Sequence, residues 1–274
     1  KMIFQAGYKK KCKVPLVVSV ILILGVLLYC KYTNMLIDLW NQINGLTGIA
    51  KVDTVKLIVP LGISYYTFSS VGYLLDIYWR KKKYEKSFLN LFVSMSFFPQ
   101  MVQGPIAHYP KLIEQVKNLK GFEYQRFCMA LQLMLWGYFK KLVIADRIAV
   151  FVNQVFNHIG YYRGLVFVLA LMASAVQLYA DFSGCMDIVE GVAELFGITL
   201  DKNFDVPFSS KSTAEFWRRW HITLGAWFKD YVFFPMSTAS WNIKISRFFK
   251  QKFGTRAGKT VTSIIPLTVV WLLT

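Results

Sequence analysis

The sequence predicts an all-α protein that crosses a membrane several times. Of its 274 residues, 55% are hydrophobic and 17% are charged, and the mean hydropathy is +0.40. A soluble domain carries about 25% charged residues. The charges are also clustered, and the apolar runs between the clusters approach the roughly 20 residues that a helix needs to cross a bilayer. We therefore expect a multi-pass membrane protein.

The placement of the net charge of +17 argues against a nucleic-acid partner. Lys and Arg gather beside apolar runs, as in residues 9–13 and 80–83. Cytoplasmic loops and anionic lipid headgroups explain that placement. The four cysteines have neither metal-ligand nor disulfide spacing, so we expect single thiols and no bound metal.

The ends of the sequence bear on its organisation. It begins at Lys1 and ends at Thr274, inside an apolar run that starts near Val261 and is too short to cross a bilayer. We expect residues 1–274 to form one membrane-embedded domain and to be an internal portion of a longer chain.

The first half of the chain predicts two spans and a broken segment. Val14–Cys30 is uncharged and aliphatic and follows basic residues, as a span that enters from the cytoplasm does. Leu57–Leu75 is rich in small and weakly polar residues, which favours a helix packed inside a bundle. Phe88–Pro110 is apolar, but Pro99 and Pro105 interrupt it. We expect a kinked or re-entrant segment lining a cavity there; a helix-ending loop is the alternative.

Two further spans follow a polar stretch. Lys111–Arg126 is predicted to lie on the surface, and Phe127–Ile144 and Gly164–Ala180 to cross the membrane. Lys140 and Lys141 interrupt the first of these spans, so they either reach the interface or face a cavity, and an interfacial cluster is favoured. The other two histidines, His108 and His158, are expected to be structural.

Two acids bracket a Ser-Gly pair where the Gly164 helix is expected to end. Asp181 and Asp187 flank Ser183 and Gly184, which predicts a turn at the rim of a cavity. The alternative is a cap in which Asp181 or Ser183 accepts hydrogen bonds from the next helix. The two roles are compatible.

The stretch from Glu215 to Tyr231 is the strongest candidate for a functional site, because it concentrates Trp and charged residues in an otherwise apolar chain. Ser212 and Glu215 have the spacing of a capping box, which predicts that a helix starts there. On that helix Trp217, His221, Leu224 and Phe228 would occupy the positions i, i+4, i+7 and i+11, so His221 would share their apolar face. Residues 244–259 are basic and contain Phe, which predicts a surface loop or an interfacial helix.

Six motifs in this order resemble one known family. They lie between about Leu57 and Trp271 and read FPQMVQGPI at 98–106, KKLVIAD at 140–146, YADFSGCMD at 179–187, NFDVPFSSKS at 203–212, FWRRWHITL at 216–224 and FKDY at 228–231. Their order and spacing are similar to the membrane-bound O-acyltransferases of the alginate O-acetyltransferase type. Any one of these motifs is weak, whereas the ordered set is specific.

The resemblance implies a multi-helix bundle in the plasma membrane, with kinked or re-entrant segments and interfacial helices. It implies an O-acyltransferase that moves an acyl group, with acetyl favoured, from a cytoplasmic thioester to a hydroxyl of an envelope or extracellular polysaccharide. The donor would be acetyl-CoA or an acylated carrier protein, and an extracytoplasmic acyltransferase could be a partner. D-alanyl transfer to teichoic acid is one alternative, and a membrane transporter or channel, suggested by the broken helix, is another.

The resemblance also assigns site residues. His221 matches the first of two family histidines. The second, which is usually held to be the catalytic one, lies in a Trp-His-Gly motif that has no counterpart in the sequence, so we expect this chain alone to be inactive. His221 would line the transfer path and orient a substrate or assist proton transfer, or else be a buried structural histidine. The residues expected to support it are Asp181, Asp187, Trp217, Arg218, Arg219 and Trp220.

The supporting residues carry alternatives of their own. Arg218 and Arg219 would contact a carrier phosphate or, as we favour, hold a helix in place. The tryptophans are expected to pack rather than to bind substrate. The Arg218-Arg219 pair favours the acetyltransferase branch of the family over the D-alanyl branch.

Overall fold

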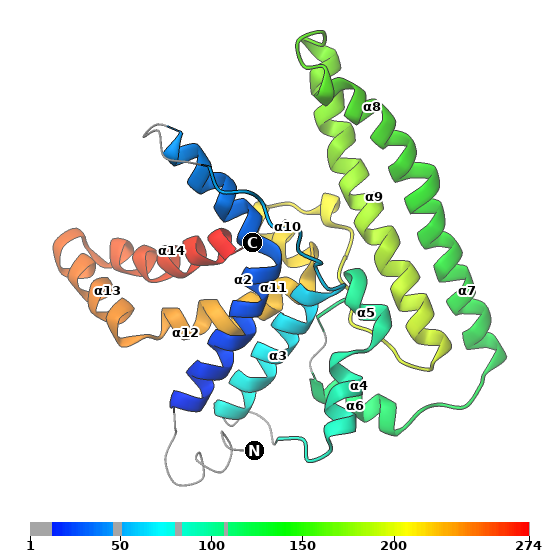
Figure 1. The fold of residues 1–274 in the computed structure, drawn as a ribbon, viewed down its shortest axis with the longest axis horizontal. Coiled ribbons are helices and arrows are strands. Elements are labelled where there is room, and N and C mark those ends of the chain that lie inside the picture. The colour runs from blue at the N-terminus through cyan, green and yellow to red at the C-terminus, as the bar shows by residue number, and fades with distance from the viewer. Residues whose placement is uncertain (1–12, 46–50, 80–83, 107–108, 274) are drawn as a thin grey trace. The chain divides into compact units, whose positions relative to one another are not determined.

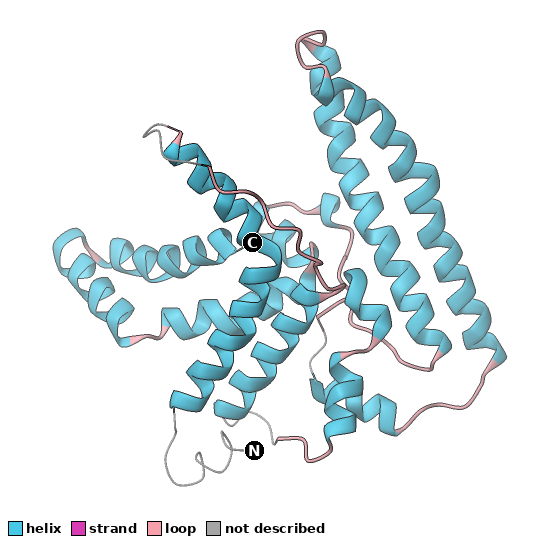
Figure 2. Ribbon diagram, in the orientation of Figure 1, coloured by secondary structure: helices cyan, strands magenta, loops and turns pink. Residues whose placement is uncertain are grey.

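A computed structural model of the chain describes residues 13–45, 51–79, 84–106 and 109–273. Within these ranges the protein is helical, and its only strand-like pairing is an isolated bridge between Phe204 and Trp220 (Figure 2). The prediction of an all-α protein is confirmed. The chain divides into two compact units, Lys1–Leu200 and Asp201–Thr274, and each is described by itself.

Three helical stretches of the first unit are long and apolar enough to cross a membrane. They are α2 (Lys13–Asn44), the stretch Tyr124–Asn157, and α9 (Leu165–Leu195). Each contains most of a span predicted from the sequence, and each extends beyond the predicted bounds. Long apolar side chains cover their exposed surfaces, such as Leu22 and Leu135 at 65% and 68% exposure, as expected of helices that face lipid.

The chain that follows α2 returns along that helix and is held by two asparagines. The amide of Asn34 accepts from the backbone N–H of Val55 and donates to its carbonyl, each at 2.9 Å. Asn41 makes the same pair with Val52, at 2.9 and 2.8 Å. The rise along the helix from Asn34 to Asn41 and the length of extended chain from Val52 to Val55 are both about 10 Å, so the two pairs are in register.

The second predicted span is wrong in its bounds. Residues 51–60 have no regular structure, and α3 runs from Ile63 to Tyr78, which is 16 residues. Pro60 and Gly62 lie where the predicted helix would have begun, and Gly62 adopts a φ of 74° that a helix cannot accommodate. α3 packs against α2, and its buried residues include Thr67 and Asp76, so it is an interior helix as expected (Figure 1).

The broken segment is confirmed. It divides into α4 (Phe88–Met95), α5 (Phe98–Gln103) and α6 (Tyr109–Lys117), while His108 lies outside the described residues. α5 packs against α3, where the hydroxyl of Tyr65 donates to Oε1 of the buried Gln100 at 2.7 Å. A cavity along this segment remains a prediction.

The expectation that Lys111–Arg126 lies wholly on the surface is wrong. Its first part is α6, which buries Leu112 and Ile113 at 2% and 5% exposure. Leu112 joins Ala193, Ile198 and Leu200 in a core cluster of the first unit. The misreading arose because lysines and glutamine on the other face of this amphipathic helix dominate its composition.

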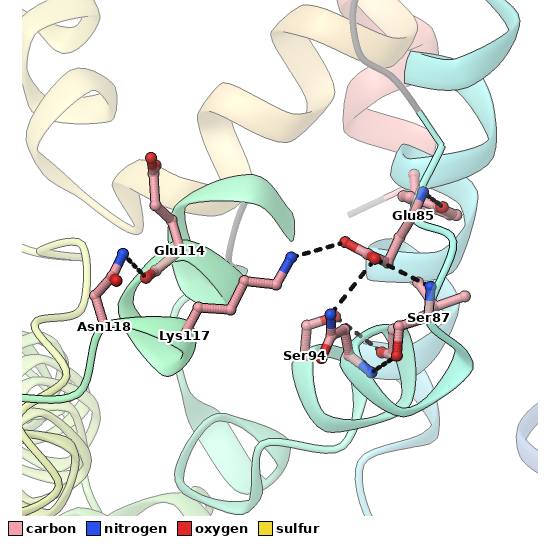
Figure 3. A network of polar contacts seen from close by, with 9 residues as sticks. Glu85, Ser87, Ser94, Glu114, Lys117 and Asn118 are labelled. Carbon is pink, nitrogen blue, oxygen red and sulfur yellow. Dashed lines mark hydrogen bonds and ion pairs between the residues drawn. The ribbon is translucent and has the colours of Figure 1, made fainter.

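Glu85 ties the segment after α3 to two of these short helices (Figure 3). Its carboxylate accepts from the ammonium of Lys117 on α6 at 3.3 Å, from the backbone of Ser87 at 3.0 Å and from the amide of Asn90 at 3.4 Å. Its own backbone N–H donates to the hydroxyl of Tyr73 on α3 at 3.0 Å. Glu85 therefore joins three helices, two through its carboxylate and one through its backbone N–H.

Two long antiparallel rods form the most regular part of the first unit (Figure 1). The first is α7 (Tyr124–Tyr138), a π-helical turn η1 (Phe139–Ala145) and α8 (Asp146–Asn157) in succession. The second is α9, which packs against all three. The described cysteines, Cys30, Cys128 and Cys185, are free thiols, as predicted.

The second unit is built from several short helical segments followed by two longer helices. These are the 3₁₀ turn η2 (Pro207–Ser209), α10 (Thr213–Arg219), α11 (Ile222–Phe228), the π turn η3 (Lys229–Phe233), α12 (Phe234–Ser237), α13 (Ser240–Phe253) and α14 (Thr255–Leu273). α13 and α14 pack as a hairpin that turns at Gly254, with φ 90°. Residues 244–259 therefore lie in these two helices and the turn between them, and their place at the interface remains a prediction.

Candidate functional site

In the first unit, Lys140 and Lys141 face the acids of α9 across the helix pair. The Lys140 ammonium lies 2.5 Å from the carboxylate of Asp187. The Lys141 ammonium lies 2.6 Å from Asp181 and 3.0 Å from Asp146. These five groups form an ion-pair cluster within the helices that are long enough to cross the membrane, where charges are costly unless they are paired.

The prediction of a turn or cap at Asp181–Asp187 is wrong. α9 continues without a break from Leu165 to Leu195, so both acids lie in its interior. Ser183 and Gly184, which suggested a turn, serve packing: a Cβ at Gly184 would lie 2.8 Å from the carbonyl oxygen of Gly137. The small residues let the helices approach closely enough for the lysines to reach the acids.

The lysines also lie in the π-helical turn η1. A π turn inserts an extra residue into a helix and so rotates the side chains that follow it. The expectation that this pair is interfacial or faces a cavity needs refinement, because both ammonium groups point to the carboxylates of the neighbouring helix.

In the second unit, the capping box is confirmed with one change. The hydroxyl of Ser212 accepts from the backbone N–H of Glu215 at 3.2 Å and begins α10. The carboxylate of Glu215 reaches back to the N–H of Lys211 at 2.9 Å, one residue before the expected partner. This bond and the nearby Arg219 and Arg218 hold the pKa of Glu215 below its usual value.

The predicted continuous helix through His221 is wrong. α10 ends at Arg219, Trp220 is extended, and α11 begins at Ile222. His221 between them has φ 44° and ψ 55°, which is the left-handed conformation. It therefore does not share a helical face with Trp217.

The break is caused by pairing with a distant loop. The bridge between Phe204 and Trp220 is flanked by two backbone hydrogen bonds. The N–H of Asp205 donates to the carbonyl of Arg219, and the N–H of Ile222 donates to the carbonyl of Asn203, both at 3.0 Å. These bonds hold Trp220 extended and His221 in the left-handed conformation, in place of the next helical turn.

His221 contacts the side chain of Asn203. Its Nδ1 lies 3.3 Å from Oδ1 of Asn203. The same oxygen accepts from the N–H of Thr223 at 3.1 Å and from its hydroxyl at 2.6 Å. Asn203 is 1% exposed and Thr223 is 8% exposed. The sequence interpretation missed both residues, although Asn203 opens one of the six motifs.

Burial lowers the pKa of His221 to about 4. The imidazole is therefore neutral at physiological pH, and one of its nitrogens can accept a proton. A general base is most effective when its pKa lies near the operating pH. The contact with Asn203 orients the ring of His221 for proton transfer, whereas the low pKa makes the ring a weak base.

The arginines differ in their surroundings. Arg219 pairs with Glu215 at 2.8 Å and donates to the hydroxyl of Ser209 at 3.0 Å. This arrangement fits the favoured expectation that the pair holds a helix in place. Arg218 is exposed, so contact with a carrier phosphate remains a prediction for that residue.

The tryptophans pack, in agreement with their predicted role. Trp217 lies edge to face with Trp271 of α14 at 4.9 Å between ring centroids. Trp220 stacks on Phe216 at 5.5 Å and meets the edge of Phe204 at 5.1 Å. These contacts tie α10 to α14 and to the loop that carries Asn203.

The ion-pair cluster and the histidine belong to different units. Each is described alone, so support of His221 by Asp181 and Asp187 remains a prediction. A shallow depression of about 370 Å³ lies over the start of α10, lined by Pro207, Phe208, Ser210, Lys211, Ser212, Thr213 and Phe216. His221 does not line it, and its place on a transfer path also remains a prediction.

Comparisons with known proteins converge on one family. The model of the membrane-bound O-acyltransferase family, MBOAT, matches residues 80–251. The match covers the ion-pair cluster, the loop of Asn203 and the stretch around His221.

Three curated relatives illustrate the range of similarity. A probable alginate O-acetylase of Pseudomonas aeruginosa is 32% identical over 81% of this chain and 42% of its own length. A peptidoglycan O-acetyltransferase of Helicobacter pylori is 32% identical over 81% of this chain and 46% of its own length. A teichoic acid D-alanyltransferase of Bacillus subtilis is 30% identical over 68% of this chain and 49% of its own length. The chain thus spans less than half the length of each.

Proposed function

Because the chain belongs to the membrane-bound O-acyltransferase family, we propose that it takes part in moving an acetyl group from a thioester to a hydroxyl of an envelope or extracellular polysaccharide. The donor is acetyl-CoA or an acylated carrier protein on the cytoplasmic side. The relatives with the higher identity are named for O-acetylation, which supports acetyl as the acyl group.

The observation that carries the proposal is the state of His221. It is neutral, it is held by Asn203, and it lies at a break between two helices rather than within one. Non-glycine residues in the left-handed conformation are uncommon and cluster at functional sites. We therefore assign the catalytic role in this chain to His221.

The reaction balances with one base and one leaving group. The acceptor hydroxyl oxygen forms a bond to the thioester carbonyl carbon while the base takes the hydroxyl proton. The tetrahedral intermediate then collapses, the carbon–sulfur bond breaks, and the thiolate leaves and is protonated. A positioned general base contributes about 10²–10⁴-fold to such a step.

D-alanyl transfer is the second candidate. The identity to the teichoic acid D-alanyltransferase supports it, over a smaller share of this chain. The two candidates differ in the acyl group and in the acceptor, so one product analysis separates them.

The test uses the full-length protein in membranes with labelled thioester donors. Acyl groups on isolated polysaccharide are identified by mass spectrometry for the wild type, His221→Gln and the control His158→Gln. His158 is an exposed histidine that caps the end of α8 and has its Nδ1 3.0 Å from the carbonyl of Gln154. We expect transfer to fall by about 10²–10⁴-fold in His221→Gln and to persist in the control.

Three results would count against the proposal. Unchanged transfer in His221→Gln would remove His221 from the chemistry. Labelled D-alanine on the product would favour the second candidate. Solute flux without transfer of any acyl group would identify a transporter.

A further inference from the structure

We infer that Asn203 is a positioning residue that fixes the tautomer of His221, with the proton on Nδ1 and the lone pair on Nε2. The geometric part of the inference stands by itself, and its catalytic consequence rests on the proposed function. The consequence is that proton transfer takes place at Nε2.

The orientation of the Asn203 amide follows from Thr223. A backbone N–H can only donate, and the N–H of Thr223 lies 3.1 Å from the atom assigned as Oδ1. If the amide were reversed, its NH₂ group would face this donor inside the protein, which is unfavourable by the cost of an unmade buried hydrogen bond. The oxygen of Asn203 therefore faces Thr223.

The same oxygen then determines the tautomer of His221. Because Oδ1 carries no hydrogen, the contact at 3.3 Å is a hydrogen bond only when Nδ1 of His221 donates. A neutral imidazole has one N–H, so Nε2 holds the lone pair. In water the neutral side chain favours the opposite tautomer, with the proton on Nε2, so the protein reverses the intrinsic preference.

The backbone holds both partners in place. The carbonyl of Asn203 accepts from Ile222, the residue after His221, at 3.0 Å. The bridge between Phe204 and Trp220 fixes the neighbouring residues of both segments. Main-chain bonds on either side of the Asn203–His221 contact therefore leave its amide and the imidazole little freedom to part.

Arg219, close to this contact along the chain, has partners of its own. Arg219 pairs with Glu215 and donates to Ser209. The neighbouring Asp205 is exposed. Burial keeps the imidazole neutral, and the contact with the neutral amide of Asn203 orients it without adding a negative charge.

The test measures the tautomer directly by NMR. The full-length protein is labelled with ¹⁵N and ¹³C at histidine and reconstituted in detergent, and the His221 signal is assigned from its loss in His221→Gln. We expect the wild-type ring at neutral pH to show the shifts of the Nδ1–H tautomer. Shifts of the Nε2–H tautomer, or of a charged imidazolium, would overturn the inference whatever the activity.

Variants then separate positioning from simple support of the fold. Asn203→Ala should shift the population toward the Nε2–H tautomer and lower acyl transfer by about 10–100-fold, as loss of an orienting partner does. Thr223→Val keeps the backbone donor and should leave the tautomer unchanged. An Asn203→Ala protein that stays fully Nδ1–H would contradict the assignment.

The control is Asn242→Ala, which removes another buried asparagine of the same unit. Asn242 donates to the carbonyls of Met236 and Thr262 at 3.2 and 3.1 Å. Loss of the Asn242 side chain should lower the stability of the protein and leave the NMR chemical shifts of His221 unchanged. An altered tautomer in this control would mean that the shifts report general loosening. Absence of acyl transfer in the wild type would refute the proposed function without touching the NMR result.

Discussion

Replacing Gly184 by Ala tests the role of the close helix contact behind the lysine–aspartate cluster. The new Cβ would lie 2.8 Å from the carbonyl oxygen of Gly137 and 3.1 Å from Cβ of Lys140. Ordinary van der Waals contact begins at 3.4 Å, so α7 and α9 must part by at least 3.4 − 2.8 = 0.6 Å. Both obstructing groups belong to helix backbone or to its first side-chain carbon, which cannot rotate away.

The magnitude follows from three terms. Overpacking of this kind costs about 1–3 kcal/mol. Stretching the Lys140–Asp187 contact from 2.5 Å by 0.6 Å costs about 1 kcal/mol at an effective dielectric constant of about 20. The higher helix propensity of Ala returns about 1 kcal/mol. We expect Gly184→Ala to lower the free energy of unfolding by about 1–3 kcal/mol.

The assay compares this variant with Gly25→Ala. Gly25 lies within α2, and a Cβ added there would meet no other atom within 4 Å, so that substitution changes propensity alone. Unfolding is followed by circular dichroism as SDS is titrated into mixed micelles. Gly25→Ala should be neutral or stabilising by up to about 1 kcal/mol. Equal stability of the two variants would refute the argument from close contact.

Three further predictions address other parts of the molecule. Glu85→Gln should lower the melting temperature and reduce the free energy of unfolding by about 1–2 kcal/mol, because three donors lose a charged acceptor. Lys117→Met removes only a half-exposed partner of Glu85 and should reduce the free energy of unfolding by less than about 1 kcal/mol. The pKa of His221 is lowered from 6.5 to about 4 in the folded protein, so the unfolded state binds the proton more readily. The free energy of unfolding should therefore be highest above pH 6.5 and fall by about 2–3 kcal/mol as the pH is lowered to 4. Thermal melts of His221→Gln should lack this contribution. If α13 lies at the lipid interface, a spin label at the exposed Phe248 should be more accessible to oxygen than one at Ser246, which bonds to the carbonyl of Gly258 on α14; equal accessibility would contradict that placement.

The parts of the fold that were predictable from the sequence depend on local composition. Long apolar runs identified three membrane helices because a span needs little more than length and low charge. Prolines marked the break after Phe88 because they remove backbone donors. The capping box at Ser212 was recognisable because a cap involves neighbours in sequence.

Two of the errors arose where a distant segment decides the local conformation. Ser183 and Gly184 resemble a turn in sequence, yet they lie within a helix, where Gly137 of another helix packs against Gly184. His221 has the spacing of a helical face, yet the helix stops before it because residues 203–205 pair with residues 219–222. Periodicity within a window contains no information about either partner.

The helix break therefore follows from the site rather than from the local sequence. A left-handed conformation costs a residue such as His221 about 1–2 kcal/mol, which neighbouring interactions must offset. Asn203 supplies those interactions through its carbonyl, which accepts from Ile222, and through its side chain, which accepts from Thr223 and His221. Since the bonds that allow the strained backbone also orient the imidazole, the conformation of His221 and its tautomer are linked. A substitution at Asn203 should release both, whereas α10, which has its own cap and packing, should remain helical.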